Sequence, residues 1–437
     1  MYRKVVNLLF CFLMVKTLVA FDLNHLNDGG KIWALLVAGS NGYYNYRHQA
    51  DVCHAYHVLN SHGIPDERIV VMMYDDIAQH SLNPTKGVII NHPDGHNVYK
   101  GVLKDYTKLD VTPKNFLNVL QGKSDEMKNI GSGKVIKSGP KDHIFVYFAD
   151  HGAIGLVSFP NQVLYARELN AAIKNMYQQK KFSKMVMYVE ACESGSMFDK
   201  LLPDNINVFV TTAANPIESS FACYWDDLRQ AYLGDLYSVT WMEDSDKEIL
   251  TKETLKKQFE IVKKQTNASH VQEYGDLTIA NMKISEFQGE KQSSGLETFE
   301  IPLDAIPSHQ VPLITLKRKL QMTNSFEEME NTENELIKLL RNRDYLLDKV
   351  ESIVTRATFT AQQVDTILSQ RFELFNFDCY EQTVKYFSEN CFSISANAYA
   401  MRYLHVFVNM CETGISADKQ IKAMSVVCIH PPIHGIL

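Results

Sequence analysis

Two short segments carry the residue types of nucleophilic catalysis. Asp150-His151-Gly152 ends one apolar run, and the segment from Glu190 to Ser196, which contains Cys192, ends the next. A cysteine attacks a carbonyl carbon as its thiolate, and a nearby imidazole can hold the thiol reactive and protonate a leaving amine. The two run ends place a His and a Cys where they can meet. The sequence therefore predicts a cysteine hydrolase.

The elements that must position these residues form a repeating pattern. β-rich apolar runs alternate with longer stretches of helical character, and the runs cover residues 32–38, 69–74, 143–149, 185–190 and 208–212. Such a pattern is typical of a parallel sheet covered by helices on both faces, an α/β sandwich. Ligands bind beyond the carboxyl ends of such strands. Four segments are expected to converge there, and they contain Asn45 to His48, His151, Cys192 and Ser219-Ser220.

The chain of 437 residues is too long for one ordinary domain of roughly 100 to 200 residues. Residues 289–312 are rich in Gly, Ser, Glu and Pro without apolar periodicity, which predicts a linker or extended segment. Apolar residues recur at helical spacing from Ser325 onward. We therefore expect a signal peptide at 1–20, a catalytic domain at 21–288, a linker or activation peptide at 289–324 and a helical domain at 325–437.

Charge and hydropathy restrict the partners and the compartment. The net charge is -7 and the Lys and Arg residues are scattered, so no nucleic-acid partner is expected. The basic residues Arg3 and Lys4 precede an apolar stretch that ends near Ala20, which indicates a secretory signal peptide although Lys16 interrupts it. No later stretch reaches the roughly 20 apolar residues of a spanning helix. The prediction is a protein of the secretory pathway without a membrane span, either lysosomal or endosomal, or secreted, for example into a gut lumen.

Cysteine usage agrees with that route. Cys11 leaves with the signal peptide, whereas Cys379, Cys391, Cys411 and Cys428 cluster near the C-terminal end and predict two disulfides with three possible pairings. Cys53 and Cys223 are expected to be small buried apolar residues. The sequon Asn267-Ala268-Ser269 predicts a glycosylated surface position. Neither Cys192 nor any His cluster has metal-ligand spacing, and no phosphate-binding Gly loop is evident, so no metal or cofactor is expected.

Several segments together resemble the legumain family, the asparaginyl endopeptidases of the caspase-like cysteine protease group. Besides the two segments above, the resemblance is carried by residues 38–42, 44–51, 63–66, 72–76, 211–216 and 241–246 and by the four C-terminal cysteines. It covers nearly the full chain. It implies a caspase-like α/β/α sandwich with a mostly parallel sheet, followed by an all-helical C-terminal prodomain.

The resemblance implies a role for each residue of the candidate catalytic group. Cys192 is then the nucleophile, His151 its catalytic partner, and Asn45 lies near the His. The backbone N–H groups of Gly152 and Cys192 are candidate oxyanion donors, because glycine permits the close backbone approach that the developing oxygen needs. Asp150, which directly precedes the His, is expected either to cap the strand by hydrogen bonding or to form a succinimide.

The resemblance also implies a pocket for the side chain before the scissile bond, lined by Arg47, His48, Glu190, Ser220 and Asp235. An Asn carboxamide offers both donors and an acceptor, so a pocket with an arginine on one side and carboxylates on the other satisfies both ends. An Asp side chain should be accepted only when it is protonated, since its carboxylate would face two acidic residues. Cleavage after Asp is therefore expected mainly at acidic pH.

A zymogen is a further implication. The C-terminal domain would cover the active-site edge and be released at acidic pH, when carboxylates at the domain interface become protonated. The matching processing site is Asn324, while the basic triplet at 317–319 is either a rival site for a trypsin-like processor or a solvated charge run. The resemblance suggests the disulfides Cys379–Cys411 and Cys391–Cys428. Expected partners are protein and peptide substrates, the chain's own prodomain as an inhibitory lid, and cystatin-type inhibitors.

The predicted function is thus a cysteine endopeptidase that cleaves after Asn, with peptide ligation as a side activity when an amine intercepts the thioester. Two alternative functions fit the sequence less well. A lipid-anchor transamidase subunit shares the His and Cys motifs, but a C-terminal membrane segment is missing and the helical domain is present. A non-enzymatic inhibitor or binding protein would not need Asn45, His151 and Cys192, which are all intact.

Overall fold

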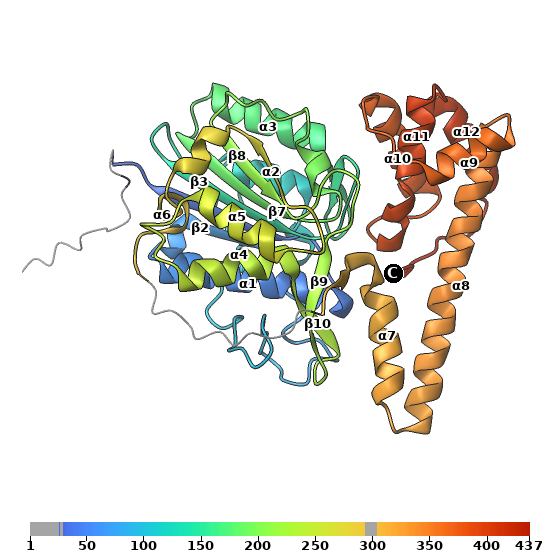
Figure 1. Ribbon diagram of the computed structural model, residues 1–437, viewed down its shortest axis with the longest axis horizontal. Coiled ribbons are helices and arrows are strands. Elements are labelled where there is room, and N and C mark those ends of the chain that lie inside the picture. The colour runs from blue at the N-terminus through green and yellow to red at the C-terminus, as the bar shows by residue number, and fades with distance from the viewer. Residues whose placement is uncertain (1–25, 27–28, 293–303) are drawn as a thin grey trace, which may run out of the picture.

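The computed structural model describes residue 26 and residues 29–292 and 304–437. Figure 1 shows an α/β domain with a central sheet and, beside it, a separate column of helices formed by the C-terminal part of the chain. The predicted signal peptide lies outside the described residues, as does part of the predicted linker. Within the described part of the chain, no helix combines the length and apolarity needed to cross a membrane.

The central sheet has six strands in the order β11-β8-β7-β3-β1-β2. The strands are β1 (Ile32–Ala38), β2 (Ile69–Met72), β3 (His143–Ala149), β7 (Lys184–Glu190), β8 (Val208–Thr212) and β11 (Gln272–Gly275). All neighbours are parallel except β11, which pairs antiparallel with β8. Strands β1 and β3 are buried along their whole length, as expected for parallel strands covered on both faces.

Helices cover both faces of this sheet. In β1, Leu36 packs into the core under α1, α4 and α5, whereas the adjacent Leu35 packs into the core under α2 and α3. The helices of this domain are α1 (Tyr46–Ser61), α2 (Pro113–Leu120), α3 (Ala166–Gln178), α4 (Leu236–Lys247), α5 (Leu255–Gln265) and α6 (Ser285–Gln288). The predicted α/β/α sandwich with a mostly parallel sheet is confirmed.

Two small sheets, which the sequence did not predict, lie outside the central one. Strands β4 (Gly152–Ala153), β5 (Leu156–Ser158) and β6 (Val163–Tyr165) form an antiparallel meander directly after His151. Strands β9 (Phe221–Asp226) and β10 (Ala231–Asp235) form a hairpin, and β12 (Ile306–Pro307) adds to it antiparallel to β9. Strand β12 belongs to the predicted linker, so this segment forms part of the folded α/β domain.

The C-terminal domain is helical, as predicted. It contains α8 (Phe326–Ala357), α9 (Ala361–Ser369), α10 (Phe377–Asn390), α11 (His405–Glu412) and α12 (Ala417–Val427), and α7 (Val311–Met322) lies alongside α8 in Figure 1. Helix α7 falls in the segment 289–324 predicted as a linker or activation peptide, and this part of the segment is helical. The disulfides Cys379–Cys411 and Cys391–Cys428 are both present, which confirms the expected pairing. The free cysteines Cys53 and Cys223 are buried, also as expected.

Candidate active site

His151 and Cys192 follow adjacent parallel strands at the same level. Ala149 at the end of β3 pairs with Glu190 at the end of β7, and each candidate catalytic residue comes two positions after its strand residue. The carboxyl ends of parallel strands meet at one edge, so the register brings the imidazole and the thiol to the same place. Both side chains line one cavity of about 170 Å³, together with Asn45.

The hydrogen bonds of Asn45 determine the tautomer of His151. Asn45 Nδ2 donates to the carbonyl oxygen of Asn41 at 2.8 Å, so its Oδ1 is the atom that faces His151 Nε2, also at 2.8 Å. An amide oxygen can only accept, and Nε2 therefore carries the proton. This leaves Nδ1 bare and able to take a proton from a thiol. Asn45 thus lies next to His151, as the sequence comparison implied.

The thiol of Cys192 lies among two serines at the start of β9. Its Sγ is 3.2 Å from Ser219 Oγ and 3.6 Å from Ser220 Oγ, and it accepts from the Ser220 backbone N–H at 3.4 Å. Burial raises the pKa of Cys192 to about 11, although the serine hydrogen bonds act in the opposite direction. Burial lowers the pKa of His151 to about 3, with Arg47 acting in the same direction. The covered site therefore holds a neutral thiol beside a neutral imidazole.

Gly152 is packed too closely for any side chain. A Cβ atom at this position would lie 2.3 Å from the carbonyl oxygen of Cys192, so only glycine fits between the two strand ends. The close approach brings the backbones of the two proposed oxyanion donors side by side. Their role as donors stays a prediction.

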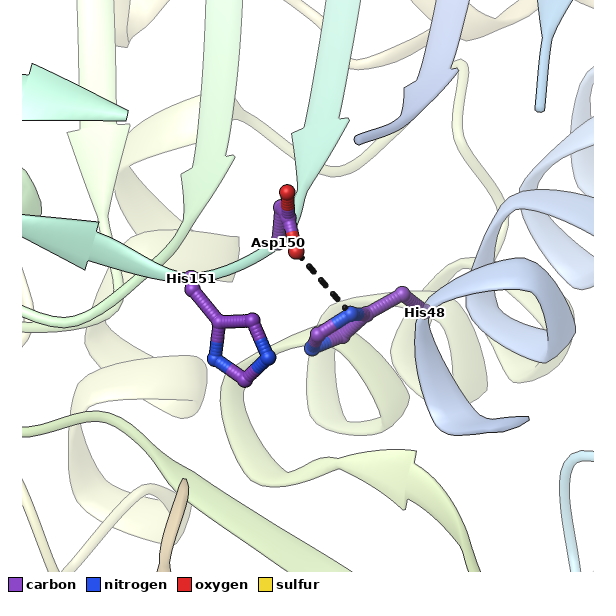
Figure 2. A group of neighbouring side chains, drawn as sticks. All are labelled: His48, Asp150 and His151. Atoms are coloured by element: carbon purple, nitrogen blue, oxygen red, sulfur yellow. Dashed lines mark ion pairs between the residues drawn. The ribbon is translucent and has the colours of Figure 1, made fainter. Parts of the chain in front are cut away.

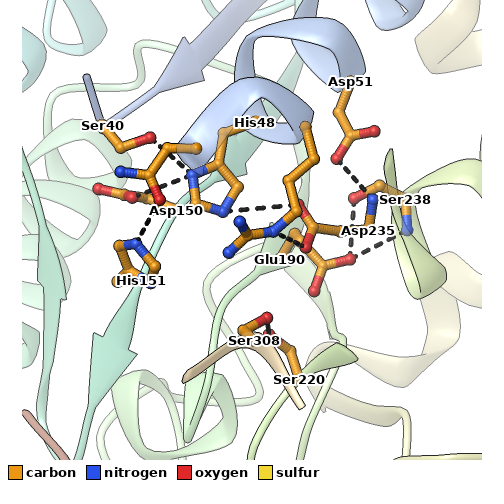
Figure 3. Close-up of polar contacts among 12 residues, drawn as sticks. Ser40, His48, Asp51, Asp150, His151, Glu190, Ser220, Asp235, Ser238 and Ser308 are labelled. Carbon is orange, nitrogen blue, oxygen red and sulfur yellow. Dashed lines mark hydrogen bonds and ion pairs between the residues drawn. The ribbon is translucent and has the colours of Figure 1, made fainter. Parts of the chain in front are cut away.

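A group of buried charged side chains lies behind the dyad of His151 and Cys192. Figure 3 shows its carboxyl groups gathered around the first turns of α1. Arg47 Nε donates to Asp235 Oδ1 at 2.7 Å, and both side chains are 1% exposed. Glu190 Oε2 accepts from both the backbone N–H and the hydroxyl of Ser238, at 3.0 and 2.9 Å. Ser220, the hydroxyl of which lies 3.6 Å from Cys192 Sγ, contacts the thiol. The structure thus brings the predicted pocket residues Arg47, Glu190 and Asp235 together and places a fourth, Ser220, beside the thiol.

His48, the fifth, connects two carboxyl groups within this layer. Its Nδ1 lies 2.6 Å from Ser40 Oγ and 3.3 Å from Asp150 Oδ1, and its Nε2 lies 3.5 Å from Asp235 Oδ2. Burial lowers the pKa of His48, and Arg47 acts in the same direction. A neutral ring in this position supports the pocket from behind.

Three atoms of the pocket are buried with no hydrogen-bond partner among the described residues: Arg47 Nη2, Glu190 Oε1 and Asp235 Oδ2. One is a donor and two are carboxyl oxygens, of which Asp235 Oδ2 lies 3.5 Å from His48 Nε2. Buried polar atoms are normally paired, and unpaired ones cost roughly 1–3 kcal/mol each. Their grouping marks a place where a polar side chain of another molecule would complete the hydrogen bonds.

Asp51 belongs to this group although no role was predicted for it. It follows Arg47 by four residues on α1, so both point to the same side of the helix. Its Oδ1 accepts from Asn91 Nδ2 at 2.7 Å and its Oδ2 accepts from the backbone N–H of Asp235 at 3.2 Å. The sequence could have indicated this residue, because Arg47 and Asp51 are spaced one turn apart on a buried helix.

His48, Asp150 and His151 are also the only set among the described residues whose ligand atoms are close enough to hold a metal ion, all within 4.8 Å of one another. Figure 2 shows the carboxyl group of Asp150 directed at the ring of His48, with the ring of His151 beside it. Each histidine already has a protein partner, Ser40 or Asn45. A metal would have to displace these contacts.

The helical domain and the segment before it cover the site. Strand β12 pairs with β9, and the Ser308 backbone N–H donates to the carbonyl oxygen of Ser220 at 2.9 Å. Residues from both domains line the cavity around Cys192, and those from the helical domain are Arg371, Ala398, Tyr399, Met401, Arg402 and Leu437. Substrate cannot reach Cys192 while this cover is in place.

Ion pairs, a buried hydrogen bond and apolar contacts connect the two domains. Arg167 Nη1 pairs with Asp378 at 2.6 Å, and its Nε and Nη2 form a bidentate pair with Glu381. Lys200 pairs with Glu373. Tyr380, which is fully buried, donates to the carbonyl oxygen of Ile154 at 2.6 Å. The contacts combine charged pairs with apolar packing of β4 and β5 against the helical domain.

The two predicted modification sites are both exposed. Asn324 lies in the three-residue break between α7 and α8, where Ser325 caps the next helix by accepting from the Glu328 backbone N–H. Asn267 is exposed, whereas the hydroxyl of Ser269 in the same sequon is buried and donates to the carbonyl oxygen of Ala213 at 2.7 Å. Cleavage and glycosylation stay predictions.

Comparison with known proteins gives two family matches. Residues 32–290 match the peptidase C13 family and residues 334–428 match the legumain prodomain. Bovine legumain is 52% identical over 94% of this chain and 95% of its own length. Hemoglobinase of Schistosoma japonicum is 43% identical over 95% of this chain and 98% of its own length. A vacuolar-processing enzyme beta-isozyme of rice is 41% identical over 92% of this chain and 85% of its own length.

Among solved structures, caspase-1 from Spodoptera frugiperda aligns with 62% of this chain and 93% of that chain. The TM-score is 0.35 and the sequence identity is 11%, so this likeness adds nothing to the two family matches.

Proposed function

The chain belongs to the peptidase C13 family and carries a legumain prodomain, and from this we infer that it is a cysteine endopeptidase that cleaves after Asn and is made as a zymogen. The helical domain is its prodomain. The roles of individual residues, the processing site, the compartment and the further partners are proposals that the following observations support.

The three unpaired atoms of the pocket carry the proposal for specificity. Arg47 Nη2 can donate to the oxygen of an Asn carboxamide, while Glu190 Oε1 and Asp235 Oδ2 can accept its two N–H bonds. Each unpaired atom then gains one partner. A site built to hydrogen-bond both ends of a carboxamide rejects apolar side chains of similar size, because they leave its polar groups unpaired.

We assign the chemical steps to the residues around Cys192. His151 Nδ1 takes the thiol proton, and Sγ attacks the carbonyl carbon of the peptide bond. The backbone N–H groups of Gly152 and Cys192 stabilise the oxyanion. The imidazolium then protonates the leaving amine, and water hydrolyses the thioester with His151 as base. An amine in place of that water would give ligation.

The experiment that tests this function measures cleavage of matched peptides with Asn, Asp, Arg or Leu before the scissile bond, using enzyme freed of its prodomain. We expect strong preference for Asn. Burial, and then Asp235, raises the pKa of Glu190. An Asp side chain needs one extra proton in the pocket, on itself or on Glu190. The Asp-to-Asn ratio of kcat/KM should therefore fall by up to about tenfold per pH unit above that titration.

Glu190→Gln is the matched variant for this pH dependence. Its amide can donate to a substrate carboxylate at any pH, so cleavage after Asp should persist at pH 7. Equal cleavage of all four peptides would rule out the proposed pocket. If no peptide is cut after the prodomain has been removed, the proposed catalytic roles fail as well, and the binding-protein alternative would be preferred.

We propose that the zymogen is processed after Asn324. Exposure of this residue in a short break between two helices supports access by a protease. Asn324→Gln should block formation of the fragment that ends at residue 324 when the full chain is incubated at acidic pH, as seen by mass spectrometry. Lys319→Gln is the matched control, and loss of processing in that variant alone would instead assign the site to the basic triplet at 317–319.

The proposed compartment follows from the disulfides, and the further partner follows from family membership. Two disulfides in the prodomain favour an oxidising compartment, so we propose the secretory pathway, with lysosome, endosome or the extracellular space as destinations. Cystatin-type inhibitors stay a proposed class of partner that rests on family membership.

A further inference from the structure

His309 lies at the centre of the contact between the two domains. It belongs to the short 3-10 turn Ser308–Gln310, which joins β12 to α7, and its ring faces the cavity that contains Cys192. On the catalytic side its Nδ1 lies 3.4 Å from Ser219 Oγ, the hydroxyl that also contacts the thiol. On the prodomain side its Nε2 contacts Arg402, and its backbone oxygen accepts from Arg343 Nη2 at 3.0 Å.

These contacts require a neutral ring with one defined tautomer. A guanidinium has only donors, so Nε2 of His309 must be bare to accept from Arg402. Ser219 Oγ uses its own proton in a 2.9 Å bond to the Ser220 carbonyl oxygen, so it accepts from Nδ1–H of His309. An imidazolium has no acceptor. Protonation therefore removes the Arg402 bond and turns it into a contact between two cations.

The surrounding charges make a cationic ring more unfavourable. The titratable and charged groups that face the His309 side of the cavity are Arg47, His151, Cys192 and Glu193 from the catalytic domain and Arg343, Arg371, Tyr399, Arg402 and Tyr403 from the prodomain. Four of these are arginines, and Glu193 is the one side-chain carboxylate among them, while Arg343 Nε also donates to the Leu437 oxygen at 2.8 Å. The ring would gain its charge within a predominantly positive layer.

Glu193 itself cannot supply an acid-driven release. Burial raises the pKa of Glu193 to about 8, and this outweighs the lowering by Arg371 and Arg402. A carboxyl group with a raised pKa in the closed form binds its proton more tightly there than after opening. Acidification through Glu193 alone thus favours closure. A group that triggers release must instead have a lower pKa in the closed form than after opening.

We propose that His309 is an acid-sensitive latch of the zymogen: its neutral ring joins Ser219 of the catalytic domain to Arg402 of the prodomain, and protonation of the ring releases the prodomain from the active site. The latch rests on the zymogen function described above and names the residue that makes release depend on pH.

The direction of the pH dependence follows from the pKa of the His309 ring in the closed and in the open form. Burial lowers the pKa of His309 to about 3 in the closed form, and Arg402 and Arg343 act in the same direction. After opening, the ring would have an ordinary pKa of 6.5. Closure is therefore fully favoured above about pH 6.5 and weakens as pH falls below it. The contribution of this ring to the opening constant should therefore rise about tenfold from pH 7.5 to 5.5 and roughly a hundredfold by pH 4.5.

Amide hydrogen exchange of the full chain tests this latch. The Ser308 amide reports release of the turn that carries His309, because it donates to the Ser220 carbonyl oxygen of the catalytic domain. Exchange of peptides covering residues 304–312 is measured from pH 4.5 to 7.5 and corrected for intrinsic rates, with Cys192→Ala to prevent self-cleavage. His309→Gln keeps one acceptor and one donor but cannot be charged. Glu193 and His151 titrate in both chains, so the ratio of the parent's opening constant to that of the variant isolates the His309 ring. This ratio should rise about tenfold from pH 7.5 to 5.5 and roughly a hundredfold by pH 4.5.

His434→Gln is the matched control, because His434 is an exposed prodomain histidine, and it should behave like the parent. A ratio of the two opening constants that stays constant between pH 7.5 and 4.5 would overturn the proposal. If His309→Gln is already open at pH 7.5, Arg402→Met decides. This variant removes the guanidinium donor that requires a neutral His309 ring. The rise of the opening constant with falling pH should therefore weaken at least threefold. An unchanged rise would refute the latch. None of these readouts depends on peptide cleavage, so they stay informative if the asparaginyl specificity fails.

Discussion

Replacing Cys192 with alanine is expected to lower kcat for an asparaginyl peptide by at least about 10⁴-fold. The alanine variant lacks the atom that forms the thioester, and no other described thiol can replace it, because Cys53 and Cys223 are buried in the core. The oxyanion donors and the pocket remain, so substrate binding should change little. The measurement is single-turnover and steady-state cleavage by enzyme freed of its prodomain.

Cys53→Ala is the matched control for this experiment. Cys53 has the same side chain but contacts Met73 within the core of the α/β domain, away from the site. We expect this variant to lose some stability and keep its activity. Substantial cleavage by Cys192→Ala, or loss of activity in the Cys53 variant without unfolding, would contradict the assignment of the nucleophile. A thiol-directed label that reacts only after prodomain release would give independent support.

The closed zymogen should also be poorly reactive for a chemical reason. In the covered site the Cys192 pKa is raised to about 11 and that of His151 is lowered to about 3. Neither ion of a thiolate–imidazolium pair is therefore favoured at neutral pH. Prodomain release admits water and removes the burial that causes both shifts. Latency thus comes from two effects of the same cover, blocked access and an uncharged dyad.

Replacing Arg47 with methionine is expected to lower kcat/KM for asparaginyl peptides by about 10³-fold, or about 4 kcal/mol. Two losses add. The carboxamide oxygen of the substrate loses its donor, Nη2, and Asp235 is left buried without its 2.7 Å partner. Breaking a buried pair by removing one partner typically costs about 3–5 kcal/mol. The measurement is kcat and KM for matched Asn and Leu peptides.

The Leu peptide distinguishes lost recognition from a general collapse. If Arg47 acts through recognition, the Asn-to-Leu ratio should fall by most of the 10³-fold effect, while the variant still folds. Arg47→Lys should be intermediate, since an ammonium keeps the charge without the planar arrangement of donors. If the variant keeps its preference for Asn, or loses cleavage of the Asn and Leu peptides in parallel, Arg47 does not recognise the carboxamide.

Local sequence determined the sheet and the chemistry of its edge. Continuous apolar runs such as 143–149 indicate strands buried on both faces, and three of the five predicted strands have the observed bounds. His151 and Cys192 each come just after such a run, and strand geometry then brings them to the same edge of the sheet. The resemblance to the legumain family supplied the roles of Asn45 and Arg47 and the pairing of four cysteines.

Other features of the site depend on segments far apart in the chain, so no local pattern could predict them. Strand β12 looks like a linker in sequence, because two residues that pair with β9 have no periodicity of their own. His309 is a single residue in a polar turn, so no local pattern predicts a function for it. It becomes a latch only where Ser219 and Arg402, 90 residues before it and 93 after it, meet its two ring nitrogens.

The sequence by itself therefore determined which residues can react and on which edge of the sheet they stand, because strand burial and residue type are local properties. Only the tertiary structure decided which charges are buried together, which atoms of the pocket stay unpaired and that the dyad is neutral under its cover. The physical reason is that desolvation and hydrogen-bond completion depend on every group around an atom, and those groups come from all parts of the chain.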